Sequence, residues 1–201
     1  YKEVDSSKLN GANRSSSTMT FSSAEYQKGE VTETTGMLLV SNWSDDFITE
    51  FSYSTKEQLT SQQSPVGQGL PSFTINDCGA QGIRCALGPD VFRSANQLAT
   101  ETTFTKLKGT YYMGNHKFTF GYENKLWDIY NVFIEAQDGG YEFEGIANYQ
   151  AQIASSFEHQ NSRTLSEQGG AAVFEYYLDS FYIQDEIDIS EKLNVLVGVR
   201  Y

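Results

Sequence analysis

Apolar and polar residues alternate through several long runs of this sequence, and this alternation restricts the possible folds more than any other feature. In the last run, KLNVLVGVRY, one side carries Leu193, Val195, Val197, Val199 and Tyr201, and the other carries Asn194, Leu196, Gly198 and Arg200. Similar alternation covers residues 47–56, 99–113, 117–126 and 181–187. A period of two is typical of a β-strand whose faces meet different environments. The longer runs contain more residues than a typical strand of a globular protein, which has about 5 to 6. Their length matches that of a tilted strand that crosses a bilayer, which needs about 9 to 11 residues.

The links between these runs alternate in length. Short links at 44–46, 114–116 and 190–192 predict three tight hairpins. Long links at 61–98 and 136–170 are polar and rich in Gly, Ser, Gln and Asn. Outer-membrane barrels sort their connections in this way, with short periplasmic turns and long extracellular loops.

The predicted fold class is therefore all-β: an antiparallel up-and-down transmembrane β-barrel segment of about six strands with two long extracellular loops. A seventh strand is expected if part of residues 15–34 pairs with the first hairpin. Because a barrel closes with at least about 8 strands, we expect the 201 residues to be a fragment of a larger barrel.

Composition excludes two classes of protein. The chain has 14 Lys and Arg against 26 Asp and Glu, for a formal net charge of −12, which argues against binding to nucleic acid. No stretch approaches the about 20 apolar residues of a membrane helix. The 13 Tyr and 13 Phe, with only 3 Pro, suit pleated strands.

The alternation assigns side chains to two environments in a barrel. The residues predicted to face lipid are Phe118, Phe120, Phe181, Ile183, Leu193, Val195, Val197 and Val199. Those predicted to face the lumen are Lys106, Lys108, Lys117, Glu123, Lys125 and Arg200. Two interpretations of the lumen charges are open: they pair across strands or bind a plug, or they form a conduit that attracts an anionic ligand. We expect Tyr53, Tyr111, Tyr122, Trp127 and Tyr201 to form interfacial girdles.

Cys78 and Cys85 lie close together in CGAQGIRC, within a polar stretch that contains Gly and Pro. This spacing predicts a small local disulfide and an oxidising compartment, with two free thiols as the alternative. The nearest histidine, His116, is far away in sequence and no second ligand pair accompanies it, so we expect no zinc site.

Enzyme signatures are absent from the sequence, which contains no GxSxG, HExxH, GxxxxGK[ST] or GxGxxG. His116 falls in a predicted turn and His159 in a predicted loop, without a nucleophile partner. Asp138 precedes two glycines and is expected to form a turn rather than a calcium loop. We therefore expect no catalytic residues, no metal and no cofactor.

Two stretches carry a family resemblance: GPDVFRSANQLATETTFTKLKGTYYMGNHKFTFGYENKLWDIYNVFI at 88–134 and FYIQDEIDISEKLNVLVGVRY at 181–201. They resemble the barrel of TonB-dependent outer-membrane receptors, particularly members with an N-terminal carboxypeptidase-regulatory-like domain. The resemblance implies that residues 1–201 are a partial barrel, with the plug domain and the remaining strands outside this sequence. It implies uptake of a scarce or bulky ligand across the bacterial outer membrane, driven through TonB, ExbB and ExbD. The implied partners are outer-membrane lipid, the TonB complex and an unknown transported ligand.

Two other functions remain open from the sequence. One is a secreted β-sandwich that binds glycan or acts in adhesion, with the long links as binding loops. The other is a passive porin-like pore, which differs from a transporter in lacking a plug. A sandwich is expected to bury Leu193, Val195, Val197 and Val199 under a second protein layer, whereas a barrel leaves them to lipid.

Overall fold

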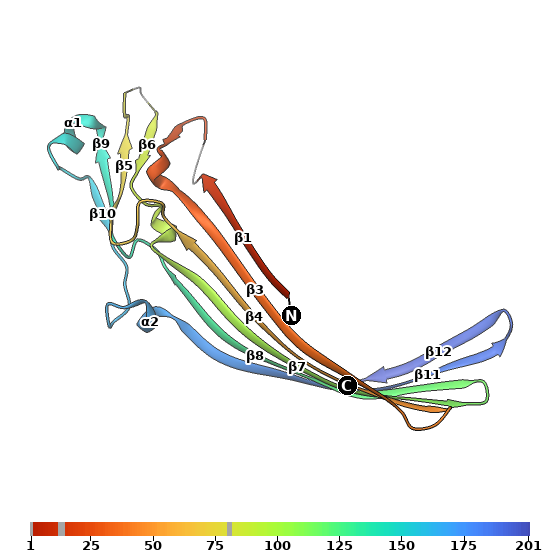
Figure 1. Ribbon diagram of the computed structural model, residues 1–201. Coiled ribbons are helices and arrows are strands. Elements are labelled where there is room, and N and C mark those ends of the chain that lie inside the picture. Colours follow the sequence, from red (N-terminus) through yellow and green to blue (C-terminus); the bar gives the residue numbers. More distant parts are fainter. Residues whose placement is uncertain (1, 12–14, 80–81) are drawn as a thin grey trace.

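The computed structural model describes residues 2–11, 15–79 and 82–201. A large curved antiparallel sheet forms most of the molecule, and a smaller sheet lies at one end of it (Figure 1). The helices are short, and none of those in the described ranges is long and apolar enough to cross a membrane. The predicted all-β architecture is confirmed.

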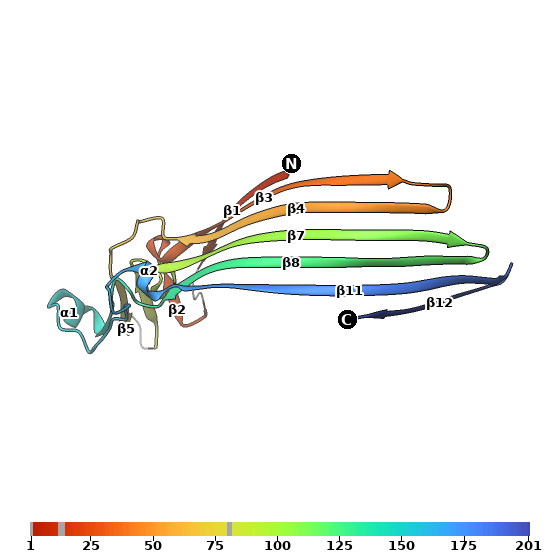
Figure 2. The ribbon, with the colours of Figure 1, turned by 90° about the horizontal axis from the view of Figure 1, so that it is seen from below.

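The large sheet contains seven strands that lie side by side in chain order (Figure 2). They are β1 (Lys2–Gly11), β3 (Glu25–Asn42), β4 (Phe47–Gln63), β7 (Ala95–Met113), β8 (His116–Ile134), β11 (Ala172–Ser190) and β12 (Leu193–Arg200). Every neighbouring pair is antiparallel, so the topology is up-and-down. The sheet is open, with β1 and β12 as its two edges.

The six predicted strands are all present, and the three tight hairpins join them as expected. In the turn between β7 and β8, Gly114 has a φ of 62°, a conformation that a residue without a side chain adopts freely. In the turn between β3 and β4, the backbone N–H of Trp43 donates to the carbonyl of Phe47 at 2.9 Å. These turns fix the register of each hairpin.

The seventh strand does not come from the segment expected. Within residues 15–34, residues 25–34 extend β3 beyond its alternating part, and Thr18–Thr20 joins the smaller sheet. The seventh strand is β1, which pairs with the first half of β3. Both segments are polar on both faces, so neither carries the period of two that predicts a strand.

The two long links are folded segments rather than simple loops. They supply β5 (Ser72–Asn76), β6 (Arg84–Leu87), β9 (Gly140–Glu144) and β10 (Ser156–Glu158), which form the smaller sheet together with β2 (Thr18–Thr20). Short helical turns complete these segments: η2 (Val91–Arg93), α1 (Gly145–Gln150) and α2 (Glu167–Gly170). A further turn, η1 (Ser22–Ala24), lies between β2 and β3.

Aromatic contacts between the two links hold the smaller sheet together. The ring of Phe73 on β5 stacks on that of Tyr141 on β9, with centroids 5.9 Å apart, and Tyr141 contacts Phe157 on β10 at 4.7 Å. Phe73 also meets Tyr149 of α1 edge to face at 6.0 Å. These residues lie far apart in sequence, so their association becomes visible only in three dimensions.

Cys78 and Cys85 form a disulfide, as predicted. Their Cα atoms are 5.8 Å apart, and the bond closes the hairpin between β5 and β6. No free cysteine is present in the described parts of the chain. The disulfide is consistent with an oxidising compartment.

Most of the large sheet has no second layer of protein over it. A small buried cluster of Ala95, Val132 and Ile134 lies where the long links meet β7 and β8. Elsewhere large apolar side chains are open, and Phe181 remains 59% exposed. No described residue covers the valines of β12, which a β-sandwich would have buried.

Candidate functional site

The register of the large sheet sorts its side chains onto two faces. One face carries Phe120 with its neighbours Gly109 and Ile183, and we call it the Phe120 face. The other carries Lys108 with its neighbours Glu50 and Gly121, and we call it the Lys108 face.

The sheet is further divided along its strands. The turn half comprises residues 35–42, 47–55, 105–113, 116–124, 180–190 and 193–200, next to the short turns. The loop half comprises residues 25–34, 56–63, 95–104, 125–134 and 172–179, next to the smaller sheet.

All eight residues predicted to face lipid lie on the Phe120 face of the turn half. These are Phe118, Phe120, Phe181, Ile183, Leu193, Val195, Val197 and Val199. The other strands add Leu39, Phe51 and Leu107 to the same surface. The result is a continuous apolar surface that runs from β3 to β12, and contact of this surface with lipid stays a prediction.

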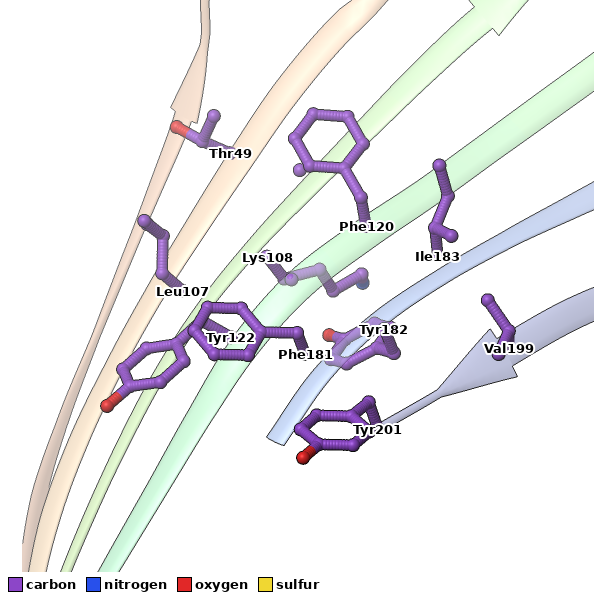
Figure 3. A pocket seen from close by; sticks show the side chains of 12 residues that line it. Thr49, Leu107, Lys108, Phe120, Tyr122, Phe181, Tyr182, Ile183, Val199 and Tyr201 are labelled. Atoms are coloured by element: carbon purple, nitrogen blue, oxygen red, sulfur yellow. The ribbon is translucent and has the colours of Figure 1, made fainter. Parts of the chain in front are cut away.

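A shallow groove of ≈ 550 Å³ crosses this apolar surface (Figure 3). Leu107, Phe120, Phe181, Ile183 and Val199 line much of it. The ring of Phe120 lies over Gly109, where a Cβ atom would come within 2.5 Å of the ring. A glycine is therefore required for this close cross-strand packing.

Ion pairs connect the strands on the Lys108 face of the turn half. The Nζ atom of Lys108 lies 2.7 Å from Glu50 on β4. Glu123 bridges Lys106 at 3.2 Å and Arg200 at 2.7 Å, which links β7, β8 and β12. These contacts join residues that are far apart in sequence. Lys106 and Glu123 are 17 positions apart, and Glu123 and Arg200 are 77 positions apart.

The remaining predicted lumen residues also lie on the Lys108 face. Lys117 pairs with Glu186 at 3.1 Å. Lys125 instead places its Nζ atom 5.4 Å from the centroid of the Phe104 ring. Four of the five predicted cations thus meet a carboxylate, which favours cross-strand pairing over an open cationic conduit.

Glu123→Gln is expected to lower the free energy of unfolding by about 1 to 2 kcal/mol, because it leaves Lys106 and Arg200 without their shared carboxylate. The Glu123 side chain is only 14% exposed, so water replaces the lost partner incompletely. Urea unfolding in lipid vesicles measures the effect. Glu191→Gln, in the exposed turn before β12, is the matched control and should change nothing; equal stability of both variants would contradict the role of the bridge.

A row of carboxylates crosses the Phe120 face in the loop half. It consists of Glu33, Glu57, Glu101, Asp128 and Glu175, each directly opposite the next on adjacent strands. In the six strands from β3 to β12, every Lys and Arg lies on the opposite face. This row cannot be recognised from the sequence, since its members align only when the register of five strands is known.

On the Lys108 face of the loop half, a group of apolar and aromatic side chains lies on β8, β11 and the adjoining part of β7. Phe104, Trp127, Ile129, Phe174, Tyr176 and Leu178 occupy adjacent positions of β7, β8 and β11. On β11 this face is therefore apolar in the loop half, whereas it is mostly polar in the turn half. Tyr122 and Trp127 were both predicted to form interfacial girdles, and the structure places them on opposite faces of β8, so they do not lie in one girdle.

Polar contacts mark both ends of the apolar surface. Near the loop half, Asp179 accepts hydrogen bonds from the Tyr122 hydroxyl at 2.5 Å and from Asn124 at 2.8 Å. Near the short turns, Asp185 lies 2.7 Å from His116 Nδ1. The two aspartates thus interrupt the apolar pattern of β11 where partners are available.

The described histidines and carboxylates do not form a metal-binding centre. No group of three His, Cys, Asp or Glu in residues 15–79 and 82–201 is arranged to hold a metal ion. His159 lies against Phe157, with ring centroids 6.2 Å apart, and His116 stacks on Phe118. Each histidine therefore has a structural neighbour of its own.

One comparison with known proteins gives a match. Residues 5–201 match the family described as outer membrane beta barrel domain. No curated protein and no solved structure matches the chain. The match covers nearly the whole sequence and agrees with the up-and-down sheet, the open apolar surface and the disulfide. The chain therefore belongs to the outer membrane beta barrel domain family and is a component of the bacterial outer membrane.

Proposed function

We propose that this chain is part of a TonB-dependent transporter that takes up a scarce or bulky ligand. Membership of the outer membrane barrel family supports a transport or porin-like role, and this family is typically non-enzymatic. The observation that carries the proposal is the sorting of the turn half into an apolar Phe120 face and an ion-paired Lys108 face.

The orientation of the large sheet in the membrane follows from the environment, lipid or water, that the side chains of each face tolerate. Charged side chains on the lipid side of a barrel cost about 2 to 4 kcal/mol near the midplane, whereas a wet lumen accepts them. The Phe120 face then contacts acyl chains, and the Lys108 face lines the lumen. Because the short turns of such barrels are periplasmic, the smaller sheet lies on the cell exterior.

Three features favour a transporter over a pore. The stretches at 88–134 and 181–201 resemble the barrel of TonB-dependent receptors. The charges of the Lys108 face are paired across strands, a surface suited to contact with a plug. The long links form an ordered sheet outside the membrane, where a ligand would first meet the protein. In this proposal residues 1–201 are one part of the barrel, and the plug and the remaining strands belong to the rest of the protein.

The test uses the full-length protein in lipid. Surface plasmon resonance should show binding of the periplasmic domain of TonB, and planar bilayers should show no steady conductance, because the plug closes the lumen. Removal of the N-terminal segment that engages TonB should abolish binding while leaving the conductance low. ExbB and ExbD are expected to be needed for uptake in cells.

Two other outcomes would replace the proposal. Steady ohmic conductance without TonB binding would establish the porin-like pore, for which the charged Lys108 face is the favouring observation. A clean monomer in buffer without detergent would contradict both the transporter and the pore. The secreted glycan-binding sandwich is not supported, because the valines that it would bury lie uncovered on β12.

A further inference from the structure

The loop half of the Lys108 face has a composition that the wet interior of a barrel does not require. Six side chains form a continuous apolar patch on β7, β8 and β11, which we call the aromatic wall. They are Phe104, Trp127, Ile129, Phe174, Tyr176 and Leu178. The rings of Trp127 and Tyr176 stack with centroids 4.5 Å apart and planes 12° from parallel.

The aromatic wall is open in the structure. Phe174, Tyr176 and Leu178 are each about half exposed, on the part of β11 that pairs with β8 and lies beyond the pairing with β12, and Phe104, Trp127 and Ile129 are partly buried. The wall lies on the face opposite to the apolar Phe120 surface. In the proposed orientation it therefore faces the lumen and not the lipid. A contiguous apolar patch in contact with water marks a place where another molecule binds.

Charge at the wall is one-sided. On β7, β8 and β11 the carboxylates of the loop half, Glu101, Asp128, Glu175 and Asp179, all lie on the opposite face. Lys125 lies at the edge of the wall, beside Phe104 and opposite Leu178. Within residues 15–79 and 82–201 no carboxylate comes within ion-pair distance of Lys125, whereas Lys106, Lys108 and Lys117 all have such partners.

We propose that the aromatic wall binds an anionic ligand with an aromatic or apolar body, whose charge is met by Lys125. The stacked pair of Trp127 and Tyr176 offers a flat surface to a ring, and the ammonium group at the edge of the wall complements a carboxylate or similar anion. This inference rests on the proposed function, since it names the class of ligand that meets the wall on its way through the lumen.

The experiment uses the full-length protein in lipid nanodiscs, labelled with 5-fluorotryptophan and observed by fluorine NMR. Trp127→Phe assigns the reporter resonance on the wall, and Trp43, near a short turn, is an internal reference far from it. The probes are 2-naphthoate and the cationic 2-naphthylmethylammonium, which share one ring system and differ in charge. The Trp127 resonance is expected to shift saturably, with an affinity about tenfold higher for the anion.

Lys125→Gln should remove the preference for the anion, and Lys125→Arg should retain it. Lys192→Gln, in the exposed turn before β12, is the matched control and should behave as the wild type. Saturable shifts of equal affinity for both probes, insensitive to Lys125→Gln, would overturn the role of Lys125. Absence of any shift at Trp127 would overturn the wall as a binding surface, as expected if a plug covers it.

The two proposals fail separately. Binding at Trp127 in a protein that conducts ions and does not bind TonB would remove the transporter and keep the ligand surface. TonB binding without any response at Trp127 would keep the transporter and remove the ligand surface.

Discussion

Leu107→Arg is expected to lower the free energy of unfolding in lipid vesicles by about 2 to 4 kcal/mol. Leu107 is 52% exposed and lies on the Phe120 face between Phe51 and Tyr122, near the middle of the apolar surface. An arginine there has no acidic residue directly opposite it on either neighbouring strand. Urea titration followed by tryptophan fluorescence measures the loss.

Leu196→Arg is the matched control for this prediction. Leu196 is 61% exposed, but it lies on the Lys108 face opposite Glu186, so an arginine there is expected to cost little. Equal stability of the two variants would contradict the assignment of the Phe120 face to lipid. Val197 is a weaker choice, because Asp185 lies directly opposite it and could pair with a new arginine.

Replacing both Cys78 and Cys85 by serine is expected to lower the free energy of local opening of the β5–β6 hairpin by about 2 to 3 kcal/mol. The disulfide closes a short loop at the tip of this hairpin, and its loss restores chain entropy to the open state. Amide hydrogen exchange at Ile75 on β5 should accelerate roughly 30-fold to 150-fold.

The large sheet supplies the control for the disulfide variant. Amides in the centres of β7 and β8 should exchange as slowly as in the wild type, because the bond lies outside the pairing of these strands. Reduction of the wild-type protein should reproduce the effect, and the double variant should be insensitive to the reducing agent. An unchanged exchange rate at Ile75 after reduction would show that the hairpin is held by its aromatic contacts instead.

The turn half could be predicted from sequence because each strand is largely apolar on one face and largely polar or charged on the other. Leu193 to Val199 alternate for this reason, and so do Phe118 and Phe120 with Lys117 and Thr119. The loop half could not be predicted with the same rule. There Glu101 and Asp128 interrupt the Phe120 face, and Leu126 and Trp127 place apolar side chains on both faces of β8, so the period of two is lost.

The sequence alone also missed β1 and the smaller sheet. Residues 2–11 are polar on both sides, and backbone pairing with β3 is what makes them a strand. Phe73 and Tyr141 come together from two different links, and no local pattern connects them. The disulfide was predictable, because closure of so short a loop depends mainly on local spacing.

For the turn half, the sequence by itself determined which residues form strands, which form turns and which side chains share a face. The reason is that a two-residue period and short links are local properties. Only the tertiary structure decided which residues align across strands. Register brought five carboxylates into one row, joined Lys106 and Arg200 through Glu123, and collected the aromatic wall on the face opposite to that row. The physical reason is that cross-strand neighbours are set by backbone hydrogen bonding between distant segments, and a one-residue change of register would move every one of these side chains to the other face.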